Sequence, residues 1–113
     1  MPPQQVFVIW THPLFQKSLT LLLDHPEIEI VGETCNYESA PQHIEKLRPN
    51  TVLIEETGAD EMQGLISSIY GMPWDMRILF MNLMDNQLNF YHHERLIMSN
   101  IEDLVQIILN EMR

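Results

Sequence analysis

The chain has 113 residues, of which 45% are hydrophobic and 19% charged, and its formal net charge is -10 at pH 7. This length and composition predict a single globular domain, residues 1–113, with one hydrophobic core. The 16 acidic residues outnumber the 6 basic ones, and no cluster of Lys or Arg occurs. Because nucleic-acid phosphates and anionic membranes repel such a chain, direct contact with either is not expected.

Membrane insertion and disulfide formation are also excluded by the sequence. No apolar run reaches the length of a membrane-spanning helix, and the first residues lack the pattern of a secretory signal. Cys35 is the only cysteine, so neither an intrachain disulfide nor a cysteine metal cluster can form. We therefore expect a cytoplasmic protein.

Short β-branched runs alternate along the chain with segments whose apolar residues recur at helical spacing. Pro26 and Pro49 lie just beyond the ends of two helical segments, and Pro41 lies in the first turn of one. Asn100 and Asp103 have the spacing of an N-cap and its partner. The predicted strands are residues 6–9, 28–32, 51–54, 77–81 and 96–98, and the predicted helices are residues 14–24, 39–47, 62–69 and 100–112.

Strands that alternate with helices predict right-handed crossovers and a parallel sheet. The fold class expected is therefore α/β, with a flavodoxin-like five-stranded parallel sheet and helices on both faces. Ligands of such folds bind outside the carboxyl ends of the strands. In this chain Trp10, Thr11, Glu55 and Asn82 follow or end the predicted strands there.

Three segments, residues 10–15, 26–33 and 47–55, give the chain its family resemblance. In order, spacing and residue type they resemble the receiver domains of response regulators, especially the subgroup fused to LuxR-type DNA-binding domains. The resemblance is nearly continuous over the first 57 residues, fades after Gly58 and returns in residues 77–81 and 100–108. It implies the receiver fold and a role in bacterial signal transduction.

The resemblance also implies where phosphorylation chemistry would occur. Receivers accept a phosphoryl group on an aspartate after the third strand, beside a carboxylate pair that holds Mg²⁺. A hydroxyl after the fourth strand and a lysine after the fifth contact the phosphate. In this chain the carboxylate pair corresponds to Trp10 and Thr11, the phosphoacceptor to Glu55, the hydroxyl to Asn82, and the lysine to Ile97 or Met98.

Every one of these positions departs from the family pattern, and no lysine follows Lys46. We therefore expect a degenerate pseudo-receiver with no metal, no cofactor and no enzymatic activity. The chain is also shorter than typical receivers between Asn82 and the fifth strand. The fourth helix is accordingly expected to be shortened or missing, with an irregular segment at residues 83–95.

Two of these residues allow more than one interpretation. Glu55 reaches one methylene further than aspartate and could imitate a phosphorylated aspartate, but without a lysine partner a tolerated polar residue at a strand end is the favoured interpretation. Trp10 is expected to fill the former metal pocket with its apolar ring. A stacking platform for a nucleotide base is the alternative, although no glycine-rich phosphate loop accompanies it.

The second half of the chain offers a metal motif and an interface. His92, His93 and Glu94 are adjacent, but neighbouring histidines point in different directions, so solvated loop histidines are the favoured interpretation. Aromatic and aliphatic residues near a sheet edge are common interface anchors. The residues expected at a homodimer interface are Phe90, Tyr91, Leu104, Ile107 and Ile108.

The function predicted from the sequence is a phosphorylation-independent pseudo-receiver. It would act as a protein–protein interaction or dimerisation module in bacterial signalling or transcription regulation. A small-ligand sensor that uses the strand-end crevice around Trp10, Glu55 and Asn82 is the alternative. A third possibility is that the chain is one piece of a longer regulator with a DNA-binding domain.

Overall fold

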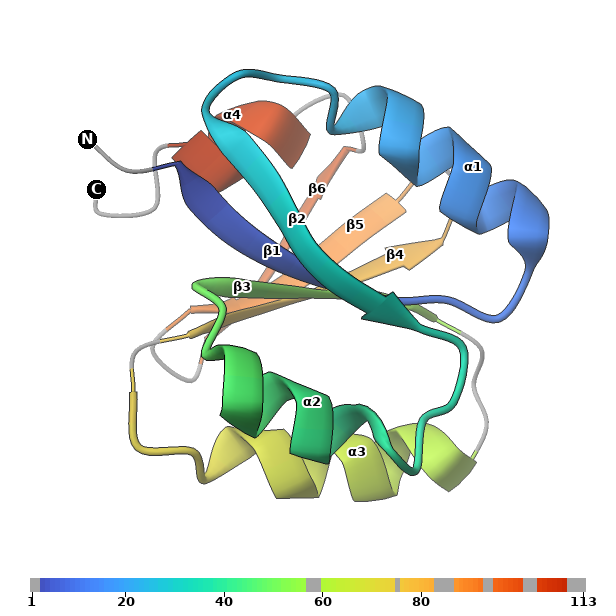
Figure 1. Cartoon of the computed structure of the whole chain (residues 1–113), viewed down its shortest axis with the longest axis vertical. Helices are drawn as coiled ribbons and strands as arrows, with labels where there is room; N and C mark the ends of the chain where they lie inside the picture. Colours follow the sequence, from blue (N-terminus) through green and yellow to red (C-terminus); the bar gives the residue numbers. More distant parts are fainter. Residues whose placement is uncertain are drawn as a thin grey trace.

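The computed structural model describes residues 3–56, 60–74, 76–82, 87–92, 95–100 and 104–109. Strands and helices alternate over the first part of the chain, and three strands follow one another before the last helix (Figure 1). The strands are β1 Gln4–Ile9, β2 Ile28–Thr34, β3 Thr51–Glu55, β4 Arg77–Asn82, β5 Gln87–His92 and β6 Arg95–Asn100. The helices are α1 Pro13–Leu22, α2 Ala40–Leu47, α3 Asp60–Tyr70 and α4 Leu104–Leu109.

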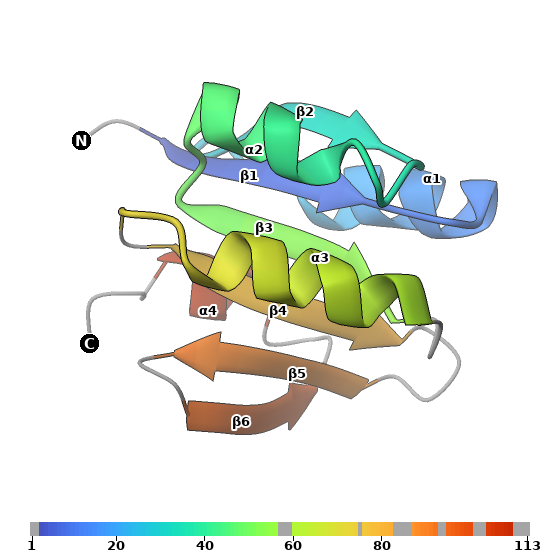
Figure 2. The same cartoon turned by 90° about the horizontal axis from the view of Figure 1, so that it is seen from below.

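The described strands form one sheet in the order β2-β1-β3-β4-β5-β6. The first four strands in the chain pair in parallel, so the α/β class and the parallel centre of the sheet are confirmed. β5 is antiparallel to both β4 and β6, so the sheet ends in a hairpin (Figure 2). The structure thus corrects one detail of the prediction: an antiparallel pair, and not a fifth parallel neighbour, follows β4.

The hairpin explains how the chain dispenses with a helix between β4 and β6. Residues 87–92 form β5 in the segment that was expected to be irregular. The predicted fifth strand at residues 96–98 exists as part of β6, but β5 separates it from β4. Because two antiparallel steps restore the strand direction, β6 runs parallel to β4 without being its neighbour. The fourth helix is thus replaced by a strand, in agreement with its predicted loss.

Helices cover both faces of the sheet, with α1 and α4 on one face and α2 and α3 on the other (Figure 1). The buried residues alternate between these two layers along each central strand, as a period of two requires. Val6, Val8 and Leu53 pack with Phe15 and Leu19 of α1. The intervening residues of the same strands face α2 and α3, including Phe7, Ile9, Val52 and Ile54.

The start and end of α2 agree closely with the sequence prediction. Pro41 lies in its first turn, where its fixed φ suits a helix and its missing N–H costs nothing. The helix ends at Arg48, whose φ of 48° is left-handed. The Arg48 guanidinium lies 5.2 Å from the centre of the Trp74 ring, and Trp74 Nε1 donates to the Pro49 carbonyl at 3.0 Å. These contacts fix the turn that leads into β3.

Arg77 is the first residue of β4 and so lies at the amino-terminal edge of the parallel strands. Its side chain is buried and contacts α4. Its Nη2 donates to Thr51 Oγ1 at 3.2 Å and to the Ile108 carbonyl at 2.8 Å. A cation near the last carbonyls of a helix is favoured by the helix dipole. No helix in the described part of the chain is long and apolar enough to cross a membrane.

Candidate functional site at the end of β3

β1 and β3 are neighbours in the parallel sheet, so the residues that follow them lie side by side at the carboxyl edge. Ile9 is the register partner of Ile54, which places Glu55 next to the turn between β1 and α1. This turn contains Trp10, Thr11 and His12. The structure therefore brings together the sequence-predicted positions Thr11 and Glu55.

The carboxylate of Glu55 is buried and bound to the β1–α1 turn. Its Oε1 accepts hydrogen bonds from the backbone N–H of Thr11 at 2.7 Å and of His12 at 2.9 Å. Its Oε2 pairs with Nδ1 of the His12 imidazole. Because a carboxylate only accepts, Nδ1 is the donor in this pair. Both oxygens of Glu55 are thus occupied by groups of the same protein.

The hydrogen bonds around Glu55 lower the pKa of its carboxyl group. Burial alone would raise this pKa because it disfavours the charged form. The imidazole of His12 and the backbone N–H groups of His12 and Thr11 favour the carboxylate and together outweigh burial. Glu55 is therefore a carboxylate at neutral pH, and its ionised form is the one that the turn binds.

Tyr37 connects the same site to the loop before α2. Its hydroxyl donates to the Glu55 carbonyl at 2.8 Å and lies 3.1 Å from Thr11 Oγ1. The Tyr37 ring is 7% exposed and packs in the cluster that contains α2 and α3. The side chain and the backbone of Glu55 are consequently held by two different loops.

Trp10 lies on another side of the turn. It is half-buried and packs against the cluster formed with α1 and α4, while its backbone N–H donates to the Thr34 carbonyl at 3.0 Å. Its indole Nε1 is buried and has no hydrogen-bond partner among the described residues. The side chain that contacts the Glu55 carboxylate is that of His12 and not that of Trp10. Trp10 therefore packs against the core, while His12 binds the carboxylate at the end of β3.

The remaining switch positions are distributed over two strands. Asn82 is the last residue of β4 and pairs with Gln87 of β5, but its side chain lies outside the described part. Ile97 and Met98 belong to β6, three strand spacings from β3 and hence about 14 Å away. The inserted β5 therefore displaces the position that would carry the family's lysine from the end of β3.

The expected interface residues fall into two groups. Phe90 and Tyr91 lie on β5, and Leu104 and Ile107 on α4, with side chains outside the described residues. Ile108 is 0% exposed and packs in the core against strands of the sheet. The prediction that Ile108 is an interface residue is therefore wrong, because the last helix buries this side chain.

The histidine motif is only partly described. His92 ends β5, while the two residues that follow it, 93 and 94, lie outside the described residues. In the part of the chain that is described, no three His, Cys, Asp or Glu side chains are grouped as metal ligands would be.

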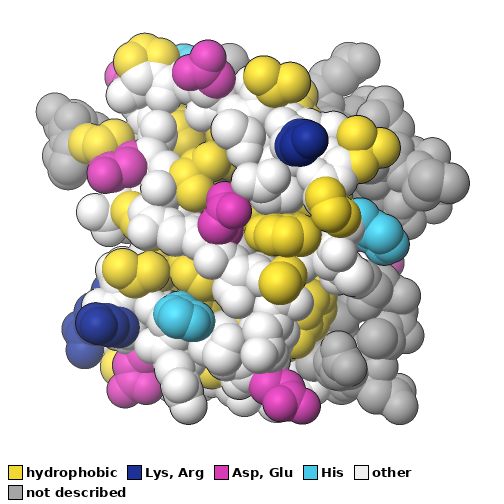
Figure 3. All heavy atoms as spheres, turned by 45° about the vertical axis from the view of Figure 1, so that its right-hand side comes forward, with side chains coloured by type: hydrophobic (Ala, Val, Ile, Leu, Met, Phe, Trp, Pro, Cys, Tyr) yellow, Lys and Arg dark blue, Asp and Glu magenta, His cyan; other side chains and the backbone are white. Residues whose placement is uncertain are grey.

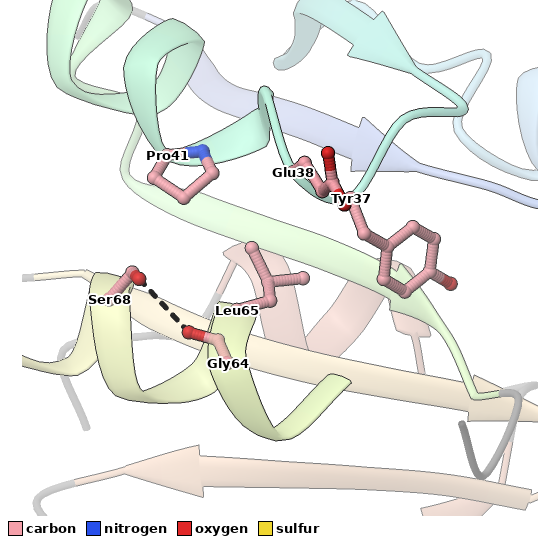
Figure 4. Close-up of a pocket in the computed structure, with 6 residues that line it drawn as sticks. All are labelled: Tyr37, Glu38, Pro41, Gly64, Leu65 and Ser68. Carbon is pink, nitrogen blue, oxygen red and sulfur yellow. Dashed lines mark hydrogen bonds between the residues drawn. The ribbon is translucent and has the colours of Figure 1, made fainter. Parts of the chain in front are cut away.

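A cavity of about 310 Å³ lies between α2 and α3, away from the predicted crevice (Figure 4). Tyr37, Pro41 and Leu65 form its apolar part, and neither Trp10 nor Glu55 lines it. Gly64 lies at its edge, where an added Cβ would meet nothing within 4 Å. The Ser68 hydroxyl donates to the Gly64 carbonyl at 2.9 Å. This cavity is therefore separate from the residues that the sequence indicated.

Sequence reasoning missed His12 and Tyr37, which supply two of the contacts that define this site. His12 had a usable signal, since it directly follows Thr11 and precedes the proline that begins α1. Tyr37 had none, because nothing in a sequence shows that the β2–α2 loop folds back onto β3.

Comparison with known proteins gives structural matches but no sequence match. No family model and no curated protein matches the chain. The signal receiver domain of the response regulator NarL from Mycobacterium tuberculosis is similar, with a TM-score of 0.58 and 24% identity over 73% of this chain and 68% of that one. The anti-anti-sigma factor PhyR from Bartonella quintana, in complex with the anti-sigma factor NepR, has a TM-score of 0.60 and 14% identity over 97% of this chain.

A second PhyR structure, that of a mutant, has a TM-score of 0.54 and 15% identity over 71% of this chain. This chain covers 34% of the mutant PhyR chain and 47% of the PhyR chain bound to NepR. The shared feature is the fold. The chain thus has an α/β fold similar to that of receiver domains, as its first half predicts, with helices on both faces of a sheet whose central strands are parallel.

Proposed function

We propose that this chain is a pseudo-receiver that acts by protein–protein contact and takes no phosphoryl group. The observation that carries the proposal is the Glu55 carboxylate, whose two oxygens accept hydrogen bonds from Thr11 and His12. Phosphorylation would require one of these oxygens to attack phosphorus. The same oxygens already satisfy the N–H groups of the β1–α1 turn.

The charge around Glu55 also opposes phosphoryl transfer. Transfer to a carboxylate places a phosphate dianion beside negative charge, which receivers balance with Mg²⁺ and lysine. Here Trp10 and Thr11 offer no carboxylate to a metal ion, and Glu56 adds another negative charge at the strand end. An uncatalysed reaction at this position is therefore expected to be too slow to regulate the protein.

Exposed leucines on α1 support a role in protein contact. Leu14 is 74% exposed and Leu21 is 78% exposed. They are seven residues apart, so they lie on one face of the helix, with Lys17 between them. Hydrophobic side chains are visible on this side of the molecule (Figure 3). Grouped exposed apolar residues commonly mark interaction sites. The PhyR structure with NepR shows that a protein with a similar fold binds a protein partner.

The test is exposure of the purified chain to acetyl phosphate and Mg²⁺, followed by intact-mass measurement. A receiver domain with the complete phosphorylation residues serves as the positive control in the same tube. We expect a phosphoryl adduct on the control only. A stoichiometric adduct on Glu55 or a neighbouring residue of this chain would contradict the proposal.

The remaining expectations are part of the same proposal. The chain would act as one cytoplasmic domain, 1–113, or as a piece of a longer regulator. It would not be an enzyme and would use no cofactor or metal. Phe90, Tyr91, Leu104 and Ile107 remain predicted contact residues for a protein partner or a second copy.

A further inference from the structure

The two outer strands of the sheet differ in how they resist pairing with another strand. β2 forms one edge and β6 the other (Figure 2). An edge strand presents unpaired N–H and C=O groups and can accept another strand unless charge, proline or a bulge prevents it. The composition and pairing of each edge therefore indicate which of them is open.

The β2 edge carries two protective features. Glu29 and Glu33 are both exposed on this strand. The pairing register shifts, because Val6 pairs with Ile30 while Phe7 pairs with Gly32. Val31 is thus an extra residue that forms a β-bulge, which twists an edge away from regular pairing. Charge and bulge together make β2 a poor partner for an added strand.

The β6 edge has no bulge, and Arg95, its first residue, is the single charged residue of the strand. Its pairing with β5 is continuous from Arg95 to Asn100, without a register shift. β6 contains no acidic residue, lysine or proline, and three of its six residues are Leu96, Ile97 and Met98. β5 contains no acidic residue either. In a chain with a net charge of -10, the residues of β5 and β6 themselves therefore bring no negative charge to a contact with a second copy.

β6 is also complementary to itself. If two copies paired antiparallel about a two-fold axis with all six residues in register, Arg95 of one copy would lie opposite Asn100 of the other. Ile97 would lie opposite Met98, so that no like charges face one another. Among the described residues, α4 packs through Ile108 over β1, β3 and β4. A two-fold dimer of this kind uses the same surface on both copies.

We propose that β6 is the dimerisation edge of this protein and that its occupant is β6 of a second copy. The pairing would join two six-stranded sheets into one continuous sheet. This inference adds a contact surface, besides the exposed leucines of α1, to the interaction role proposed above and rests on that role. The two proposals can fail separately. A protein that is monomeric and takes no phosphoryl group would overturn the pairing of β6 but not the proposed loss of phosphorylation.

The experiment compares proline variants by sedimentation velocity over a wide concentration range. Adjacent residues of a strand point their N–H groups to opposite sides, so one of Ile97→Pro and Met98→Pro removes an outward N–H and the other an N–H bonded to β5. The outward variant is identified by its unchanged circular dichroism and melting temperature. We expect the wild type to dimerise with concentration and this folded variant to remain monomeric.

Val31→Pro in the bulge of β2 is the matched control and should leave the dimer intact. If both β6 variants unfold, hydrogen exchange of the wild type decides: alternate amides of residues 95–100 should gain protection as concentration rises. A wild type that stays monomeric, a folded β6 variant that still dimerises, or amides whose exchange does not depend on concentration would each overturn the proposal.

Discussion

Replacement of Glu55 by Gln tests the hydrogen bonds at the end of β3. The glutamine carbonyl can still accept from the N–H groups of Thr11 and His12, but the negative charge is lost. The Oε2 that pairs with the imidazole becomes an amide nitrogen. Hydrogen bonds to a charged group contribute about 1.5–3 kcal/mol against about 1 kcal/mol for neutral pairs. These ranges differ by about 0.5–2 kcal/mol, and because His12 is largely exposed and water can reach it, we expect a loss in the lower half of that interval, about 1 kcal/mol.

Glu55→Ala removes the acceptor altogether and should lower the free energy of unfolding by about 2–3 kcal/mol. For a chain of this length, this corresponds to a decrease in Tm of roughly 8–12 °C, and Glu55→Gln should decrease Tm by about 4 °C. Urea unfolding of both variants measures the free energy of unfolding directly. Glu29→Gln, at an exposed carboxylate on β2, is the control and should change stability by about 0.5 kcal/mol or less.

The pH dependence of stability is an independent test of the hydrogen bonds to Glu55. The pKa of Glu55 is lowered in the folded protein, so its stabilisation is complete above the pKa of an unfolded glutamate and is lost as pH falls through the folded value. The stability difference between wild type and Glu55→Gln should therefore narrow as pH falls from about 7 to about 3. A difference that is absent at neutral pH, or that widens on acidification, would refute the assignment of these hydrogen bonds.

Three further variants test other parts of the account. Glu55→Asp introduces the phosphoacceptor residue of receivers but not their carboxylate pair, so intact mass after acetyl phosphate and Mg²⁺ should still show no adduct. Efficient phosphorylation of this variant would contradict the proposed loss of phosphorylation chemistry. Arg77→Met removes the buried hydrogen bond to the Ile108 carbonyl and should lower the free energy of unfolding, measured with urea, by about 2–3 kcal/mol. A variant that unfolds at the same urea concentration as the wild type would contradict this. Trp74→Phe loses the bond to the Pro49 carbonyl and should lower Tm by about 4 °C, whereas an unchanged melting curve would show that this bond is dispensable.

Much of the fold follows from local sequence patterns. Residues 6–9 and 51–54 are short β-branched runs because both faces of these strands are covered by helices, and that burial is what the patterns report. Pro41 and Pro49 mark the ends of α2 for reasons contained in their own geometry. The parallel order of β1 to β4 then follows from the alternation of elements.

The hairpin could not be predicted in the same way. β5 pairs with the free edge of β4, and that edge exists only once the rest of the sheet has formed. The pairing therefore depends on long-range contacts and not on the local sequence. The aromatic pair Phe90 and Tyr91 therefore looked like part of an irregular segment. The residue types alone did not distinguish a strand that follows β4 directly from one that is separated from it by β5.

The proximity of the candidate site residues Thr11 and Glu55 could be predicted from the sequence, but the contacts of Glu55 could not. The position of Glu55 at a strand end follows from the strand pattern, and its neighbourhood with Thr11 follows from parallel pairing. That the carboxylate binds the turn depends on the extra methylene of glutamate and on side-chain rotamers. Sequence patterns reveal neither these rotamers nor the hydrogen bond from the Tyr37 hydroxyl to the Glu55 carbonyl.

The central claim, that the end of β3 is occupied by the protein's own hydrogen bonds, is tested most directly by NMR of the Thr11 and His12 amides. The labelled wild type is titrated with Mg²⁺ and beryllofluoride, which together imitate a phosphorylated receiver. We predict that both amide resonances stay where they are in the free protein. Saturable shifts of these two amides, with the stoichiometry of one ligand per chain, would contradict it.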